Sequence, residues 1–281
     1  MGLAALAVTF AVGLLAGLLS GLVGIGGGVL MVPFLYFFYA HPALSGLRPP
    51  PDAATLAAHA TSLFIIFPTS VRGAWSFHRK GMVVWRAAWP IGLAAAVTAA
   101  LAAQFADRLD PRWLRLGFAA VLIFSAWRLV GSSRTPAGGG PGPERPLRLS
   151  PPVTAGTGAV MGAFSALMGV GGGVVGIPLL INWVRVDLPR VAATSLAVIT
   201  VTSLAGAAAY MAAGPALPLR PGWSVGYVDV PVALAMSAGA LAAVGWGASI
   251  NRRMDKRTLG RAFAGFFLVV GALVAWQNLP V

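Results

Sequence analysis

A glycine-rich phrase interrupts an apolar stretch twice in this chain, at positions 145 residues apart. Residues 17–33 read GLLSGLVGIGGGVLMVP and residues 162–178 read GAFSALMGVGGGVVGIP, and nine of the 17 aligned positions are identical. Consecutive glycines are poorly tolerated inside a helix, because each costs about 1 kcal/mol relative to alanine. Each copy therefore predicts a break within an apolar segment, and the duplication predicts two related halves.

The composition places these segments in a membrane. The chain has 281 residues, of which 58% are hydrophobic and only 10% are charged, whereas soluble domains carry roughly 25% charged residues. We therefore predict an all-α polytopic membrane protein. The net charge is +13, and the charged residues lie in short gaps between the apolar segments. This pattern is typical of residues that orient a protein in the membrane, and it argues against a nucleic-acid partner. The chain has no cysteine, which excludes disulfides and thiolate metal sites.

The apolar segments form two sets of five. The second segment of each set has only about 12 residues, which as a helix is roughly 18 Å long and too short to cross a bilayer. Each half is thus expected to hold three long spans and a glycine-broken helix or re-entrant hairpin, with five full spans as the alternative. We expect a first repeat over 1–131, a cytoplasmic linker over 132–150 and a second repeat over 151–281. The segments lie at 2–24, 28–40, 54–76, 83–104 and 112–131, then at 152–170, 173–184, 189–213, 226–249 and 258–278.

A second pair of phrases supports the duplication. Residues 60–74 (ATSLFIIFPTSVRGA) align with 193–207 (ATSLAVITVTSLAGA) at an offset of 133, with nine of 15 positions identical. The two offsets differ because the loops around the spans differ in length between the halves. Similarity in two separate segments indicates a duplication of the whole unit.

The basic residues predict how the chain is oriented. One set of alternate loops, which includes the linker, holds 15 of the 20 Lys and Arg residues. The positive-inside rule places that set in the cytoplasm. On this assignment the loop after the third segment is cytoplasmic in the first half and external in the second. The halves are then two inverted-topology repeats, and both termini lie outside.

Both breaks carry side chains and backbone groups suited to binding a ligand. Glycines before a short helix leave backbone N–H groups free for an anion, although the same glycines could instead only kink or pack helices. Hydroxyls near the breaks could donate to a ligand or could bond their own backbone. His59 has no counterpart in the second half and is either a buried titratable group or an interfacial one. The candidate binding residues are Gly26, Gly27, Gly28, Gly171, Gly172, Gly173, Ser20, Ser165, Thr61, Ser62, Thr194, Ser195 and His59.

The positions of the acidic residues indicate the charge of the ligand. All seven Asp and Glu residues fall in loops or at expected helix starts, and none lies in the middle of a span. A cavity lined by N–H groups and hydroxyls, without fixed negative charge, suits an anion. The absence of an acid or a metal-ligand cluster in the spans also argues against an enzyme.

The two G-x-G-G-G phrases (24–28 and 169–173), each followed by a proline, and the A-T-S-L phrases at 60–63 and 193–196 resemble those of the TauE/SafE sulfite-exporter family. The resemblance covers nearly the whole chain. It implies a multi-pass permease of the bacterial inner membrane for small sulfur-containing or organic anions such as sulfite or sulfonates.

We therefore expect a secondary transporter, most simply an exporter of a small anion such as sulfite or an organosulfonate, working by alternating access. The alternatives are an importer or channel for small anions, or a membrane scaffold or sensor that transports nothing. We expect no cofactor. The coupling ion is H⁺, taken up at His59 or on the substrate, or Na⁺ at carbonyls freed by the breaks. The partners are the anion and the lipid bilayer, with a homodimer left open.

Overall fold

The structure is a computed structural model that describes residues 2–47, 49–132, 146–214, 222–250 and 256–278. Most of the expected linker, residues 133–145, lies outside these ranges. The described part is helical almost throughout. Its one departure from the expected all-α fold is a short antiparallel hairpin before α10, formed by β1 (Ser224–Val225) and β2 (Val228–Asp229).

The helices follow the two sets of apolar segments. The first half holds α1 (Leu3–Val23), α2 (Gly28–Ala40), α3 (Pro42–Ser45), α4 (Pro51–His78), α5 (Trp85–Phe105), the 3₁₀ turn η1 (Ala106–Arg108) and α6 (Pro111–Ser132). The second half holds α7 (Pro151–Met168), α8 (Gly173–Leu179), the π-helical turn η2 (Leu180–Val184), α9 (Leu188–Ala212), α10 (Val230–Ile250) and α11 (Lys256–Asn278).

Local sequence explains several of these boundaries. Pro51, Pro111 and Pro151 each occupy the first position of a long helix, where the missing N–H costs nothing and the fixed φ suits a helix. Among the described residues, five helices (α1, α4, α5, α9 and α10) are long and apolar enough to cross a membrane. Helices satisfy their own backbone hydrogen bonds in lipid, so these segments make the chain a multi-pass membrane protein.

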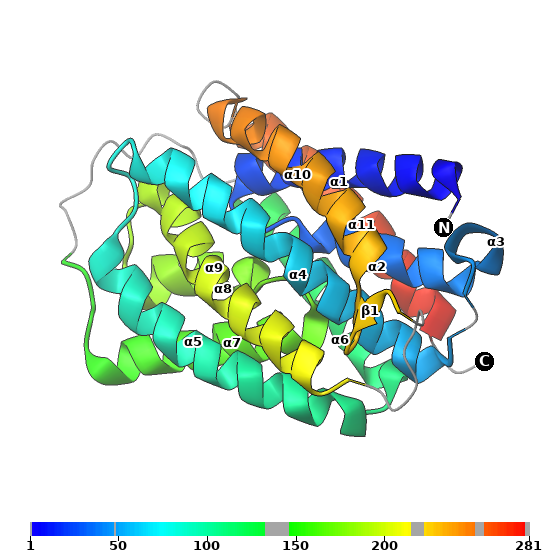
Figure 1. Cartoon of the computed structure of the whole chain (residues 1–281). Coiled ribbons are helices and arrows are strands. Elements are labelled where there is room, and N and C mark those ends of the chain that lie inside the picture. The colour runs from blue at the N-terminus through cyan, green and yellow to red at the C-terminus, as the bar shows by residue number, and fades with distance from the viewer. Residues whose placement is uncertain (1, 48, 133–145, 215–221, 251–255, 279–281) are drawn as a thin grey trace.

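The centre of the bundle is the pair α4 and α9, which pack against each other (Figure 1) and are the most buried of the candidate spans. Around them, α1 packs along α10, α5 along α7, and α6 along α11. Because α7 corresponds to α1 and α5 to α10, exchanging the two halves turns the α1–α10 pair into the α7–α5 pair. The same exchange turns the α6–α11 pair into itself. The packing is therefore symmetric between the two halves of the sequence.

Glycines bring the outer helices into close contact. A Cβ at Gly17 on α1 would overlap the carbonyl oxygen of Ala240 on α10, and a Cβ at Gly162 on α7 would overlap the carbonyl oxygen of Ala95 on α5. Small residues allow such close backbone approach in membrane helices. The first glycine of each repeated phrase thus serves helix packing, and only the later glycines make the break.

Candidate functional site

Each break reverses the chain. Gly24 ends α1 and Gly27 precedes α2, both with left-handed φ (77° and 76°), and Gly169 and Gly172 repeat this with 66° and 78°. Glycine adopts these dihedrals without the steric cost that other residues meet. After the reversal α2 runs back toward the end of the molecule where α1 begins (Figure 1), so the expected glycine-broken hairpin is present.

The reversal brings each break against the helix that precedes it. A Cβ at Gly27 would lie 2.8 Å from the carbonyl oxygen of Ala16, and one at Gly172 would lie 2.6 Å from that of Met161. Ala16 and Met161 are counterparts at the same offset of 145. The two hairpins therefore share one geometry.

The two breaks also contact each other. The Cβ position of Gly28 is 2.6 Å from the Cα of Val170 in the second break, and that of Gly173 is 2.6 Å from the carbonyl oxygen of Ile25 in the first. No side chain fits between the two loops at these points. The two breaks, which are far apart in the sequence, thus lie directly against each other.

Two isoleucines from the central helices cover the remaining glycines. The Cβ positions of Gly26 and Gly171 each lie within 3.4 Å of the Cγ2 atoms of both Ile66 on α4 and Ile199 on α9. Both isoleucines are fully buried. In this conformation the glycine tips are packed against hydrocarbon.

Three buried serine hydroxyls around the breaks have no hydrogen-bond partner among the described residues. They belong to Ser20 on α1, Ser165 on α7 and Ser195 on α9, and all three residues are fully buried. Ser20 and Ser165 lie one turn before Gly24 and Gly169. Ser195 is one turn after Ala192, whose Cα lies 2.7 Å from the Cβ position of Gly24. An unsatisfied buried hydroxyl costs about 1–3 kcal/mol.

Ser62 is engaged, because its hydroxyl donates to the carbonyl oxygen of Gly169 at 2.7 Å. This bond ties the centre of α4 to the end of α7. Ser195 is the counterpart of Ser62 in the second half, yet its hydroxyl makes no such bond in the described structure. The two breaks therefore differ in polar contacts although their backbones match.

The two threonines of the A-T-S-L phrases each accept a backbone hydrogen bond from a residue just before another helix. The Thr61 hydroxyl accepts the N–H of Asp229 just before α10 at 3.1 Å, and the Thr194 hydroxyl accepts the N–H of Val84 just before α5 at 3.2 Å. Asp229 is itself fully buried, at the end of the hairpin and outside the spans. Contact of either threonine with a ligand stays a prediction, and the structure gives both hydroxyls a partner in the fold.

His59 lies at the second break and is fully buried within the protein. Its Cα is 2.7 Å from the Cβ position of Gly169. The Nε2 atom is hydrogen-bonded to the hydroxyl of Tyr36, and Nδ1 has no partner in the described structure. Tyr36 in turn lies under the guanidinium of Arg115, 5.3 Å from the ring centroid.

Sequence reasoning missed Tyr36 and Arg115. Tyr36 stands in an aromatic run of α2 that reads as membrane-facing, and Arg115 is one of the basic residues of the presumed external loops. Only the fold shows that α2, α4 and α6 bring them together. The signal available in the sequence was that both, like His59, lack a polar counterpart in the second half.

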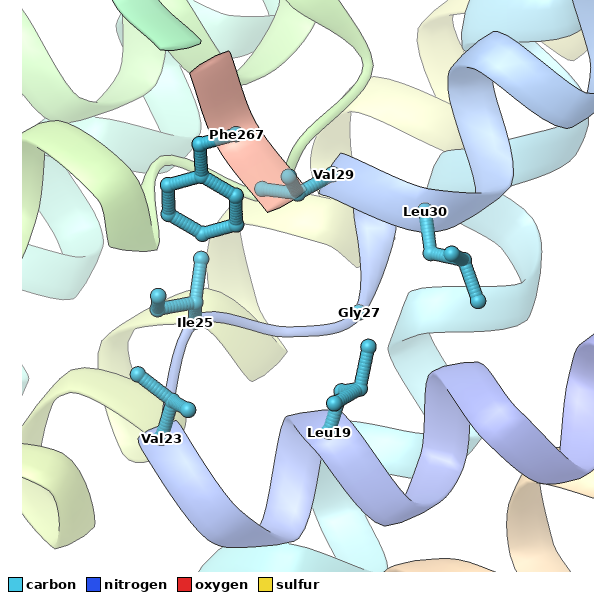
Figure 2. A pocket seen from close by; sticks show the side chains of 7 residues that line it. All are labelled: Leu19, Val23, Ile25, Gly27, Val29, Leu30 and Phe267. Atoms are coloured by element: carbon cyan, nitrogen blue, oxygen red, sulfur yellow. The ribbon is translucent and has the colours of Figure 1, made fainter. Parts of the chain in front are cut away.

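A small cavity lies beside the first break (Figure 2). It has a volume of about 20 Å³, and only apolar side chains and Gly27 line it. None of these side chains would hold an anion. The lining residues are Leu19, Val23, Ile25, Gly27, Val29, Leu30 and Phe267. For metals, no group of three His, Cys, Asp or Glu side chains in the described ranges could hold an ion.

Comparison with known proteins finds relatives that cover nearly the whole chain. A relative from Methanocaldococcus jannaschii, named "Probable membrane transporter protein", is 28% identical over 261 residues, which cover 92% of this chain and 91% of the relative. Another of the same name from Haemophilus influenzae is 27% identical and covers 92% and 94%. YunE of Bacillus subtilis, with the same description, is 25% identical and covers 95% and 96%. No solved structure matches. The model of the family "Sulfite exporter TauE/SafE" matches residues 9–274, and the chain belongs to this family.

Proposed function

We propose that the protein is a secondary transporter that binds a small oxyanion between its two glycine breaks. The observation that carries the proposal is the set of fully buried, unpartnered hydroxyls of Ser20, Ser165 and Ser195 around the breaks. Buried polar groups in native proteins are nearly always hydrogen-bonded. An oxyanion between the breaks would accept bonds from these hydroxyls and so offset their cost in the ligand-free protein.

The backbone of the first break adds to this arrangement. Gly27 precedes a helix of 13 residues, α2, whose first N–H groups and positive dipole end favour an anion. In the presence of these donors an oxyanion loses its hydration shell and gains charge-assisted hydrogen bonds. Family membership makes sulfite or an organosulfonate the substrate class to test first, with export as the direction.

The hairpins support inverted repeats. If α1 and α2 together make no net crossing, the three long helices that follow carry the chain to the opposite face before α7 begins. The second half then enters from the other side, and the chain ends on the side where it began. The N and C marks at one end of the molecule fit this path (Figure 1), and the positive-inside rule makes that end external in a bacterial inner membrane. Alternating access would follow from movement of one repeat against the other.

The test uses a variant in which both Ser20 and Ser165 are changed to alanine, reconstituted in liposomes. Removing a hydroxyl that has no partner leaves the fold as stable or stabilises it, so a loss of function cannot come from unfolding. We expect sulfite flux to fall at least about tenfold, since bonds to charged groups are worth about 1.5–3 kcal/mol, while thermal stability stays equal or rises.

The matched control is Ser203→Ala, whose hydroxyl donates to the Ile199 carbonyl at 2.7 Å and is already satisfied. It should leave flux near the wild-type value. Saturation and counterflow in the wild type distinguish a carrier from a channel, and imposed pH or Na⁺ gradients identify the coupling ion. Wild-type flux in the double variant, or no saturable flux of sulfite, sulfonates or small carboxylates in the unmodified protein, would contradict the proposal.

A further inference from the structure

The two breaks share a backbone geometry but differ in the chemistry around them. At the second break α4 presents His59, and at the first break α9 presents Ala192 at the corresponding place. The difference extends beyond this one pair. Tyr36, Thr55 and Arg115 of the first half align with Ile181, Leu188 and Gly260 of the second. These four polar side chains, including that of His59, are all in the first half.

These four side chains form one connected cluster. The Arg115 guanidinium donates to the Thr55 hydroxyl from Nε at 2.9 Å and from Nη2 at 2.7 Å. It also lies over the Tyr36 ring, which places a cation near the aromatic face. Tyr36 then bonds to Nε2 of His59. The cluster thus connects α2, α4 and α6, and it ends at an imidazole nitrogen that has no partner in the described structure.

The histidine that carries this nitrogen packs with its Cα and Cβ against the second break, and a second unpartnered group lies on the helix before that break. His59 packs against Gly169, and the hydroxyl of Ser165 lies one turn earlier on α7. If the Tyr36 hydroxyl donates to Nε2, the ring proton is on Nδ1 and the imidazole becomes a donor at that atom. Two buried donors then lack acceptors at this break. Among the described residues, the first break has the hydroxyls of Ser20 and Ser195, and Ala192 stands where the second break has an imidazole.

We propose that the second break is the principal anion site, with the His59 Nδ1–H and the Ser165 hydroxyl as direct donors to an oxyanion. Tyr36 and Arg115 are positioning residues that fix the tautomer and the orientation of the imidazole. This inference rests on the proposed function and adds to it an unequal affinity of the two breaks. The nearby guanidinium also favours an anion at this break over one at the other, because charges in a low-dielectric interior are weakly screened.

The experiment compares sulfite binding by single variants of the purified protein, measured as Kd by calorimetry. Ser165→Ala and Ser20→Ala are matched, since both remove an unpartnered buried hydroxyl at the same position of the repeat. We expect Ser165→Ala to weaken binding about 10- to 100-fold and Ser20→Ala to weaken it less than threefold. Equal effects of the two variants would overturn the inference even if the protein transports anions.

The role of His59 is tested with two replacements, so that misfolding cannot be mistaken for lost binding. His59→Ala removes the donor and should weaken sulfite binding as much as Ser165→Ala does. His59→Asn keeps an amide N–H near the position of Nδ1 and should restore at least part of the affinity. An alanine variant that binds sulfite as the wild type does, or an asparagine variant that is folded but no better than alanine, would refute the proposed donor.

Tyr36→Phe provides the readout for a positioning residue. It should weaken sulfite binding in the wild-type background and have no effect in the His59→Asn background, because the amide needs no tautomer to be fixed. Equal effects in both backgrounds would show that Tyr36 acts independently of His59. Absence of sulfite, sulfonate and carboxylate binding by the wild-type protein would instead refute the proposed function itself, and the two failures are thereby distinguishable.

Discussion

The reversal of the chain at the second break depends on Gly172, and its replacement by alanine tests the hairpin directly. The residue has φ of 78°, where an L-residue costs about 1–2 kcal/mol because its Cβ approaches the carbonyl oxygen. The new Cβ would also lie 2.6 Å from the Met161 carbonyl oxygen. This overlap can be relieved only if the backbone moves. Overpacking of this kind costs about 1–3 kcal/mol.

The net effect follows from these two costs and one gain. Alanine loses less chain entropy on folding than glycine does, which returns about 0.4–1 kcal/mol. We therefore expect Gly172→Ala to destabilise the folded protein by about 2–4 kcal/mol, or about 30- to 700-fold in the ratio of folded to unfolded molecules. Gly27→Ala should behave alike, because its φ of 76° and its 2.8 Å approach to the Ala16 carbonyl oxygen repeat the geometry.

The assay is reversible unfolding of the purified protein in detergent, compared with Gly245→Ala. Gly245 lies within α10, and no atom lies within 4 Å of its Cβ position. Alanine there should leave stability unchanged or raise it by up to about 1 kcal/mol. If Gly172→Ala proves as stable as Gly245→Ala, the left-handed backbone at residue 172 is refuted.

Three further predictions follow from the packing. Thr61→Val should lower stability by about 1–3 kcal/mol in the same unfolding assay, because it leaves the buried N–H before α10 without its acceptor; an unchanged midpoint would exclude that role. Gly17→Ala should push α1 away from α10 and reduce stability by more than about 1 kcal/mol, and a stabilised variant would disprove the close packing. Because the chain has no cysteine, single cysteines can map its orientation. An impermeant maleimide added to intact cells should label Ala43→Cys on α3 but not Ser150→Cys before α7, and the reverse pattern would invert the assigned topology.

Helices and breaks were predictable from local chemistry. Hydropathy placed a segment at 28–40, and α2 has these bounds. The segment at 173–184 corresponds to α8 and η2 together. These predictions succeed because membrane helices satisfy their own backbone and because consecutive glycines disfavour a helix. The offsets of 145 and 133 then related the halves without any knowledge of their packing.

Hydrogen-bond partners were not predictable, because they depend on contacts between distant segments. Thr61 and Ser62 are adjacent and look equivalent in the sequence, yet one accepts the N–H of Asp229 and the other donates to Gly169. Successive residues on a helix point about 100° apart, so they meet different elements. The same reason explains why Tyr36 and Arg115 could be recognised only from the packing of α2 and α6 on α4.

The isoleucines at the centre of the fold make the two breaks interdependent. The Ile66 and Ile199 side chains each pack on both Gly26 and Gly171. The two glycine tips therefore share the same two isoleucines. A shift of α4 that uncovers one tip also removes contacts from the other, and the same holds for α9. The helix α4 carries His59 and Ser62, and α9 carries Ser195. Movement of either helix therefore displaces polar groups of one break and also the isoleucine that packs on both glycine tips. Under the proposed function, movement of either helix would therefore expose both breaks together.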